Sequence, residues 1–432
     1  MSTSEQYIVV VEPHFALLRY LQIAQRRYRT LVLTHNPEAM KEAERMYNQD
    51  PWVARDRSAI DMLVPYQSVD VASMVRALRP LDGQVAGVVA GDDAFVPLAE
   101  QLGYALGFDV ARPTDADCHH LKTAMKRRLA ERGVRTPAFG IAHDYPSARQ
   151  IWQRFGGDSM VKMVDLSGSV NIFRSRSERE LHDAWDTIVH NRRAIDVPFA
   201  LATEVIVEEW VSGRELTVEG YIDGDRIEIL NYSEKLTEEN FSVVGHYIPA
   251  AVTAVEDAAL SEIARQCVRA LGLRNSVFHV EVHVRDGVPY VIECAARPPG
   301  LYAVDLIEKC YGHDLMEISI DLAVGQSVNV RRREPRGYFA VLALYSQETG
   351  ILSAIEGLDE LKERGGLMHV TLEVKPGDKI QAIYASGEKF GLVILRDDSA
   401  DGVRQKAKWL RDNVRVIVAP PERQALRRVA TQ

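Results

Sequence analysis

The first hundred residues alternate between short apolar runs and helical patterns, and no other feature restricts the fold of this chain as much. The apolar runs cover residues 7–11, 30–34 and 85–91, and the helical patterns cover residues 17–26 and 69–78. Short apolar strands separated by helices form parallel sheets with both faces covered. The sequence therefore predicts an N-terminal α/β domain, which ends near the break at Arg112-Pro113.

The middle of the chain combines helices with short strands. Apolar residues recur at helical spacing over residues 121–129, with Thr114 or Asp115 as the expected N-cap. Residues 159–164 and 171–173 predict the two strands of a hairpin, joined by a loop of small residues. This stretch therefore predicts a mixed α+β region after the first domain.

The dipeptide Asp286-Gly287 between two apolar runs is the most informative hairpin signature. A three-residue loop that ends at Gly287 places Glu281 opposite Val291. Glu281 and Glu293 then become diagonal neighbours on one face, about 7–8 Å apart. Two carboxylates in this arrangement can hold Mg²⁺ together with substrate phosphates. The alternative is a pair of solvated glutamates on an exposed sheet face.

The same strand offers a second kind of metal site. His279, Glu281 and His283 project from one face at alternating positions, as ligands of a transition metal can. Single histidines on strands are more often packing or surface residues, and the sequence shows no further His or Cys ligand nearby. The sequence therefore favours the carboxylate pair over the histidines.

Charge and apolar patterning exclude two classes of partner. The 52 basic and 61 acidic residues give a net charge of −9, without the positive excess that binding to phosphate backbones needs. The apolar run 7–11 is too short for a signal peptide or a membrane span. The four cysteines lie far apart without a CxxC pair, which indicates reduced thiols. We expect a cytoplasmic protein that binds neither nucleic acid nor membranes.

The order and spacing of charged residues along the chain resemble the ATP-grasp superfamily. The residues that carry this resemblance are Lys122, Lys162 before the loop 166–169, the segment 208–215, Glu281, Glu293 and Arg297. It extends from about residue 112 to residue 328 and implies two α+β lobes that hold ATP between them. The first hundred residues resemble the α/β domain that precedes these lobes. Residues 350–361, 374–380 and 385–395 resemble the C-terminal domain of biotin carboxylase-like members.

The resemblance implies a role for each matching residue. The phosphate-contacting residues are Lys122 and Lys162, and the loop that closes over the phosphates contains Ser167, Gly168 and Ser169. The adenine-contacting hinge contains Glu208, Glu209 and Val211, and the ribose-binding residue is Glu215. The metal ligands are Glu281 and Glu293. The residues implied in catalysis are Arg297, which helps to bind the activated substrate, and Lys162.

Two departures from the family pattern affect these implications. Ala295 stands where the pattern often has an asparagine ligand, so it is open whether one or two metal ions bind. The first strand is followed by Val11-Glu12-Pro13-His14 rather than by a glycine-rich turn. This leaves open which groups line the substrate side of the pocket.

The resemblance implies a three-part architecture of α/β and α+β domains. An N-terminal parallel-sheet domain covers residues 1–112, and a two-lobed ATP-grasp domain covers residues 113–330. The small lobe covers about residues 113–205 and the large lobe about residues 206–330. A strand-rich C-terminal α+β domain covers residues 331–432.

Within the superfamily the chain is most similar to L-amino acid ligases and related carboxylate–amine ligases. This similarity implies a ligase that joins an amino acid or similar carboxylate to an amine, with ATP and Mg²⁺ as cofactors and Mn²⁺ as a substitute. The implied route runs through an acyl phosphate and releases ADP and phosphate. Two alternatives remain, a carboxylase of the biotin carboxylase or purine-pathway type and a non-catalytic nucleotide- or metal-binding protein. The acid, the amine and the oligomeric state, a homodimer included, stay open.

Overall fold

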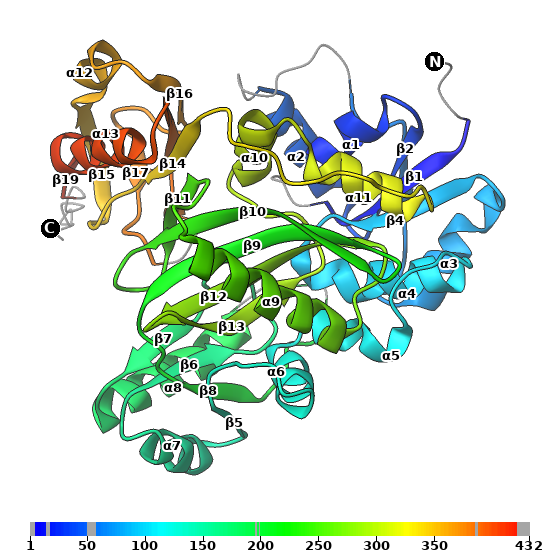
Figure 1. Ribbon diagram of the computed structural model, residues 1–432, viewed down its shortest axis with the longest axis horizontal. Coiled ribbons are helices and arrows are strands. Elements are labelled where there is room, and N and C mark those ends of the chain that lie inside the picture. The colour runs from blue at the N-terminus through cyan, green and yellow to red at the C-terminus, as the bar shows by residue number, and fades with distance from the viewer. Residues whose placement is uncertain are drawn as a thin grey trace, which may run out of the picture.

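The computed structural model describes residues 5–13, 18–49, 58–194, 197, 199–384 and 388–420. The described strands form sheets of four, eight, three and four strands. Figure 1 shows the N-terminal domain at the upper right, the C-terminal elements at the upper left, and a four-stranded sheet below the long central sheet. The predicted mixed architecture, with a parallel N-terminal sheet and a strand-rich C-terminal part, is confirmed.

The N-terminal sheet has the strand order β3-β2-β1-β4, and all of its pairs are parallel. Its strands are β1 (Tyr7–Val11), β2 (Arg29–Thr34), β3 (Met62–Pro65) and β4 (Val85–Ala90). Its helices are α1 (Arg19–Ala24), α2 (Pro37–Gln49), α3 (Val71–Leu78) and α4 (Val96–Ala105). The sequence did not indicate β3, a short edge strand that is only partly buried. Residue 17, where the first predicted helix starts, lies outside the described residues.

The next sheet is small and antiparallel, with the order β5-β8-β6-β7. Its strands are β5 (Phe139–Ala142), β6 (Ser159–Met163), β7 (Ile172–Ser175) and β8 (Val205–Glu209). Its helices are α5 (Pro113–Ala116), α6 (Lys122–Glu131), α7 (Tyr145–Arg154) and α8 (Glu178–Ala194). The predicted β6–β7 hairpin is present. The predicted N-cap is wrong, because Thr114 and Asp115 lie in the separate α5 and a turn of 3₁₀ helix intervenes before α6 begins at Lys122.

The long central sheet has the order β13-β12-β9-β10-β11-β14-β18-β16. Its first strands are β9 (Arg214–Asp223), β10 (Arg226–Thr237), β11 (Val243–Ile248), β12 (Ser276–Arg285) and β13 (Val288–Ala295). The helices of this region are α9 (Ala254–Leu271), α10 (Ala303–Tyr311) and α11 (Leu315–Ala323). A capping box between Thr253 and Glu256 starts α9, and Gly272 ends it in the left-handed conformation.

Three C-terminal strands continue the central sheet, because β14 pairs with β11. They are β14 (Tyr338–Leu344), β16 (Leu367–Leu372) and β18 (Gly391–Asp397). A separate sheet contains β15 (Gly350–Glu356), β17 (Lys379–Ile380) and β19 (Arg415–Ala419), and the helices are α12 (Leu358–Glu363) and α13 (Ala400–Asn413). The predicted domain boundaries stay predictions. The continuous sheet nevertheless places C-terminal residues on the same framework as the large lobe.

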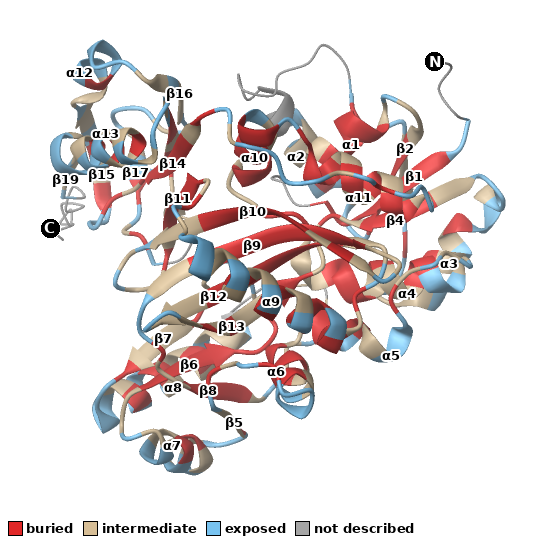
Figure 2. Ribbon diagram, in the orientation of Figure 1, coloured by how far each residue is buried: buried red, intermediate tan, exposed pale blue. Residues whose placement is uncertain are grey.

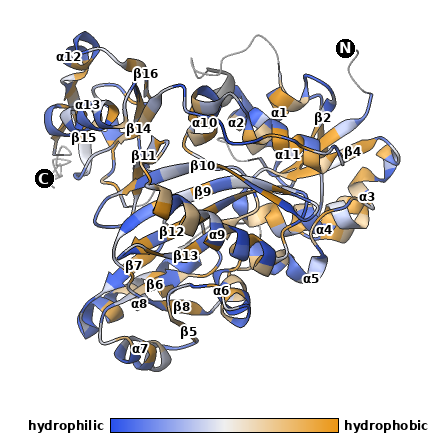
Figure 3. Cartoon of the chain, viewed as in Figure 1, coloured by the Kyte–Doolittle hydropathy of each residue, from blue (hydrophilic) through white to orange (hydrophobic). Residues whose placement is uncertain are grey.

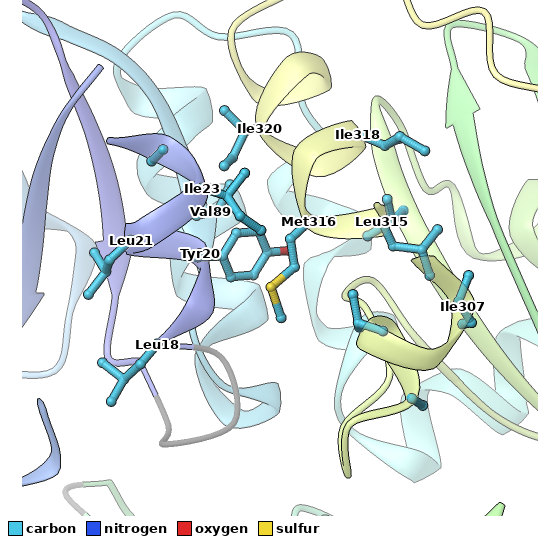
Figure 4. Close-up of a cluster of buried hydrophobic side chains, with 14 of the residues drawn as sticks. Leu18, Tyr20, Leu21, Ile23, Val89, Ile307, Leu315, Met316, Ile318 and Ile320 are labelled. Carbon is cyan, nitrogen blue, oxygen red and sulfur yellow. The ribbon is translucent and has the colours of Figure 1, made fainter. Parts of the chain in front are cut away.

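Apolar helices fix the N-terminal domain to the central sheet. Figure 4 shows Tyr20 of α1 beside Met316 of α11, within one buried cluster that also includes Leu315 and Ile307. The Tyr20 hydroxyl donates a hydrogen bond to Ser319 Oγ at 3.0 Å. Figure 2 shows buried residues through these elements, and Figure 3 shows α1 and α11 as largely apolar and α12 and α13 as largely polar. Burial of this apolar surface holds the domains together.

Two further expectations concern the described residues as a whole. All four cysteines are buried and free, as the absence of paired spacing indicated. None of the helices in the described ranges is both long and apolar enough to cross a membrane.

Candidate active site

A cavity of about 740 Å³ lies between the small antiparallel sheet, the central sheet and the start of β18. Every site residue predicted from the sequence lines it. These residues are Lys122, Lys162, Ser167, Gly168, Ser169, Glu208, Glu209, Val211, Glu215, Glu281, Glu293 and Arg297. The structure therefore brings the predicted set together, although their roles stay predictions.

Glu208 lies at the buried end of β8 between two lysines. Lys162 Nζ donates to Glu208 Oε2 at 2.6 Å, and Lys126 Nζ lies 3.2 Å from Oε1. Burial alone would raise the pKa of Glu208, but Lys126 and Lys162 lower it to about 2. Burial lowers the pKa of Lys126 to about 8, although Glu208 acts in the opposite direction. The Glu208 side chain thus neutralises buried lysines under the cavity.

This arrangement predicts a large loss of stability when Glu208 is neutralised. We expect Glu208→Gln to lower the free energy of unfolding by about 3–5 kcal/mol, because it leaves two buried ammonium groups without their carboxylate. Urea unfolding followed by circular dichroism measures this change.

The neighbouring Glu209→Gln is the matched control for Glu208→Gln. Glu209 is part-exposed and pairs with Arg285 at 3.0 Å, so its neutralisation should cost less than about 1 kcal/mol. Equal stability losses for the two variants would contradict the buried-counterion assignment of Glu208.

The hinge after β8 is tied to β12 by two side chains. Arg285 engages the Glu209 carboxylate, and His283 Nδ1 donates to the Val211 carbonyl at 2.9 Å. Trp210 lies between these residues, with the Arg174 guanidinium 4.2 Å from its ring centroid. These contacts hold the hinge segment against the wall of the cavity.

Glu281 and Glu293 are closer partners than the sequence predicted. The hairpin loop has two residues rather than three, because Asp286 (φ +54°) and Gly287 (φ +77°) both adopt the left-handed conformation of a tight turn. A bulge at Ile292 then places Glu281 directly opposite Glu293. The predicted three-residue loop and diagonal register are therefore wrong. Directly opposed residues have Cβ atoms only about 4.5–5.5 Å apart.

Lysines neutralise both members of this carboxylate pair. Lys122 Nζ lies 3.2 Å from Glu293 Oε1 and donates to the Leu166 carbonyl at 2.6 Å. Lys235 Nζ lies 2.7 Å from Glu281 Oε2 and 2.8 Å from Glu215 Oε1. Burial alone would raise the pKa of Glu281, but Lys235 holds it well below its usual range. Both carboxylates line the cavity.

The donor set fits a hard cation that is shared with phosphate oxygens. Two opposed carboxylates with lysines beside them suit Mg²⁺, which keeps several waters and uses one or two carboxylates plus substrate phosphates. Ala295 supplies no third ligand. Within the described ranges, no group of three or more His, Cys, Asp and Glu side chains could hold a metal by itself. Glu281 and Glu293 are thus the residues that would hold Mg²⁺ with a nucleotide.

The histidines of β12 have other partners. His279 Nδ1 lies 2.9 Å from Glu219 Oε1, and His283 Nδ1 is bound to the Val211 carbonyl. Burial alone would lower the pKa of His279, but Glu219 and Glu281 raise it to about 9. Both Nδ1 atoms are thus engaged by protein oxygens, and the described residues contain no group of three or more His, Cys, Asp and Glu side chains placed to hold a metal, which disfavours the alternative of a histidine metal site.

Arg297 binds a carboxylate of the N-terminal domain. Its Nε donates to Asp93 Oδ1 at 2.5 Å, and its Nη2 donates to Asp93 Oδ2. Its Nη1 donates to the Pro298 carbonyl at 2.7 Å. Asp93 begins the 3₁₀ turn Asp93–Phe95 after β4. The guanidinium lines the cavity as predicted, but its fork already holds a carboxylate, a contact that the sequence did not indicate.

The sequence also missed four other residues of this region. Lys126 follows Lys122 by four residues, so helical spacing could have indicated that the two share a face. Lys235 and His246 come together through the pairing of β10 with β11, and Lys389 reaches the cavity from the C-terminal strands. The first two depend on the register of the β10–β11 hairpin, and Lys389 depends on strand pairing between distant segments, which no local pattern shows.

Two parts of the chain match known domain families. Residues 158–304 match the ATP-grasp domain, and residues 342–419 match the L-amino acid ligase C-terminal domain 2. The predicted resemblance to ATP-grasp proteins of the amino acid ligase type is confirmed.

Comparison with curated proteins finds relatives of low identity. Uncharacterized protein y4rH of Sinorhizobium fredii is 25% identical over 75% of this chain and 67% of its own length. Alanine–anticapsin ligase of Bacillus subtilis is 22% identical over 63% of this chain. The match spans 59% of that ligase's length.

Comparison with solved structures shows the same overall fold over nearly the whole chain. L-amino acid ligase from Bacillus licheniformis has a TM-score of 0.76 at 18% identity and covers 97% of this chain and 100% of its own. Biotin carboxylase from Campylobacter jejuni has a TM-score of 0.66 at 14% identity, covering 96% of this chain and 92% of its own. At these identities the likeness concerns the fold alone.

Proposed function

We propose that this chain, an ATP-grasp ligase with an L-amino acid ligase C-terminal domain, joins an amino acid or similar carboxylate to an amine. The ligase class follows from the two domain matches. The relative named alanine–anticapsin ligase supports an amino acid as one substrate. The bicarbonate-using alternative has less support, because residues 342–419 match the L-amino acid ligase C-terminal domain 2.

The proposed reaction proceeds in two balanced steps. A substrate carboxylate oxygen attacks the γ-phosphorus of ATP, the bond to the bridging oxygen breaks, and ADP leaves. The amine then attacks the carbonyl carbon of the acyl phosphate, loses a proton and expels phosphate, which forms the amide. Bound Mg²⁺ would offset charge on the phosphate oxygens during the first step.

Side chains of this protein stabilise charge, exclude water and orient the substrate during the reaction. Lys122 and Lys162 stabilise negative charge on the transferring group, and the loop 167–169 shields the acyl phosphate from water. Arg297 orients the carboxylate, since its planar fork suits two oxygens. The reaction needs no nucleophilic side chain, in agreement with a cavity lined by lysines and carboxylates.

One observation carries the proposal, the directly opposed Glu281 and Glu293 beside Lys122 in the cavity. Carboxylates that can share a divalent cation with phosphates, next to ammonium groups, are the requirements of phosphoryl transfer from a nucleotide.

A screen for phosphate release tests the proposed function. The protein is incubated with Mg-ATP and pairs of amino acids, and release is compared with that of each member alone. We expect at least one pair to stimulate release above either member. Release that depends on bicarbonate instead would favour the carboxylase alternative, and the absence of any ATP turnover would favour a non-catalytic protein.

The identity of the spent nucleotide is a separate prediction. We expect ADP and phosphate, because an acyl-phosphate route transfers the γ-phosphoryl group and leaves the β-phosphate on the nucleotide. Chromatography of the reaction mixture distinguishes these products. AMP and pyrophosphate would instead indicate adenylation of the carboxylate.

A further inference from the structure

We infer that Lys389, on the C-terminal side of the cavity, contacts the polyphosphate chain of the bound nucleotide. This inference rests on the proposed function, because it takes the cavity as the nucleotide site. Lys389 would be a binding residue from the C-terminal domain, whereas the site predicted from the sequence lies between the two ATP-grasp lobes.

Lys389 differs from the three other lysines that line the cavity. Lys122 pairs with Glu293, Lys162 pairs with Glu208, and Lys235 pairs with both Glu215 and Glu281. Lys389 lies just before β18 and forms no ion pair with a carboxylate in the described part of the chain. It is the cavity lysine that remains available to an anionic ligand.

The surroundings of Lys389 make an unpaired ammonium unfavourable. Burial and the like charge of Lys235 lower the pKa of Lys389 to about 8, and the adjacent Glu388 only partly offsets them. Glu388 accepts a hydrogen bond from the Tyr384 backbone N–H at 3.3 Å. A ligand oxygen with negative charge would compensate this desolvated ammonium, and charge-assisted hydrogen bonds are the strong ones in such sites.

The neighbours of Lys389 indicate which anion it meets. Its charge acts on Lys235 and on the buried His246, which is directly paired with Lys235 across β10 and β11. Lys235 bridges Glu215, the proposed ribose ligand, and Glu281, the proposed metal ligand. A nucleotide that engages both glutamates has its phosphates between them. Lys389 lines the same cavity as Lys235 and these two glutamates, which makes the phosphate chain the anion for it to meet.

Calorimetric titration of the full chain with Mg-AMP-PNP, a non-hydrolysable ATP analogue, and with adenosine tests the inference. We expect Lys389→Met to weaken Mg-AMP-PNP binding by about ten- to a hundredfold, the range for hydrogen bonds to charged groups, and to leave adenosine binding unchanged. Lys389→Arg should restore most of the affinity. Lys379→Met, an exposed lysine on β17 of the same domain, is the control and should bind like the wild type.

Three results would overturn the assignment of Lys389. If Lys389→Met binds Mg-AMP-PNP as tightly as the wild type, Lys389 does not contact the phosphates. An equal loss of adenosine affinity indicates a structural role. A change confined to the KM of the carboxylate substrate indicates that the lysine binds that substrate instead.

Failure of the proposed function has a different signature. Suppose that the wild-type chain binds Mg-AMP-PNP through Lys389 but releases no phosphate with any acid and amine pair. The ligase proposal is then wrong, and the Lys389 contact stands. If the wild-type chain binds no nucleotide, both proposals are wrong.

Discussion

We expect Glu293→Gln to lower turnover by about 10²–10³-fold, the loss that follows when a contact to developing charge is removed. Glutamine preserves the shape of the side chain and removes the charge that would hold Mg²⁺ opposite Glu281. The fold should persist, because Lys122 keeps its hydrogen bond to the Leu166 carbonyl. The measurement is the steady-state rate of ADP release with a stimulating substrate pair, with circular dichroism as the check on folding.

A second measurement connects the effect to the metal. The Mg²⁺ concentration for half-maximal rate should rise in Glu293→Gln. Glu228→Gln is the matched control, because Glu228 lies on β10 outside the cavity and pairs with Arg331 at 3.1 Å. If a folded Glu293→Gln variant keeps near-normal turnover, Glu293 is a solvated surface carboxylate without a role in metal binding.

Local patterns were sufficient to predict many of the elements of this fold. Strands β1, β2 and β4 and the β6–β7 hairpin follow from short apolar runs and a loop of small residues, all within a few residues. The turn at Asp286-Gly287 was also recognised, but the bulge at Ile292 was not. The bulge adds one residue to β13, and no feature of the sequence indicates it. It changes the register between Glu281 and Glu293.

Contacts between distant segments set the limits of prediction from the sequence. Through the resemblance to the ATP-grasp superfamily, the order of charged residues predicted a set of side chains that the structure brings into one cavity. It could not show that Asp93, 204 residues before Arg297, would occupy the guanidinium fork. Nor could it show that β14 joins the central sheet and brings Lys389 to the cavity. Both depend on how domains pack against one another.

The position of Arg297 suits two functions. The guanidinium joins the N-terminal domain to the cavity wall through Asp93, which is a structural contact between part-buried charges. The same fork also suits the carboxylate or acyl phosphate of a substrate, because it presents two parallel N–H donors. A substrate carboxylate would have to share or replace the Asp93 contact.

Arg297→Lys separates these functions because lysine keeps the charge and loses the fork. We expect turnover to fall by about a hundredfold, with a higher KM for the carboxylate substrate and an unchanged KM for ATP. The melting temperature should fall only slightly, since a lysine can still neutralise Asp93. Steady-state kinetics with each substrate varied, together with thermal unfolding, measure both effects.

Asp93→Asn provides the opposite comparison. It removes the carboxylate partner of the part-buried Arg297, so the free energy of unfolding should fall by about 1–3 kcal/mol. Its turnover, measured well below the melting temperature, should fall less than that of Arg297→Lys, because the fork stays available to the substrate. If Arg297→Lys instead keeps full turnover and loses as much stability as Asp93→Asn, the arginine only joins the domains. The carboxylate of the substrate is then bound by another group in the cavity.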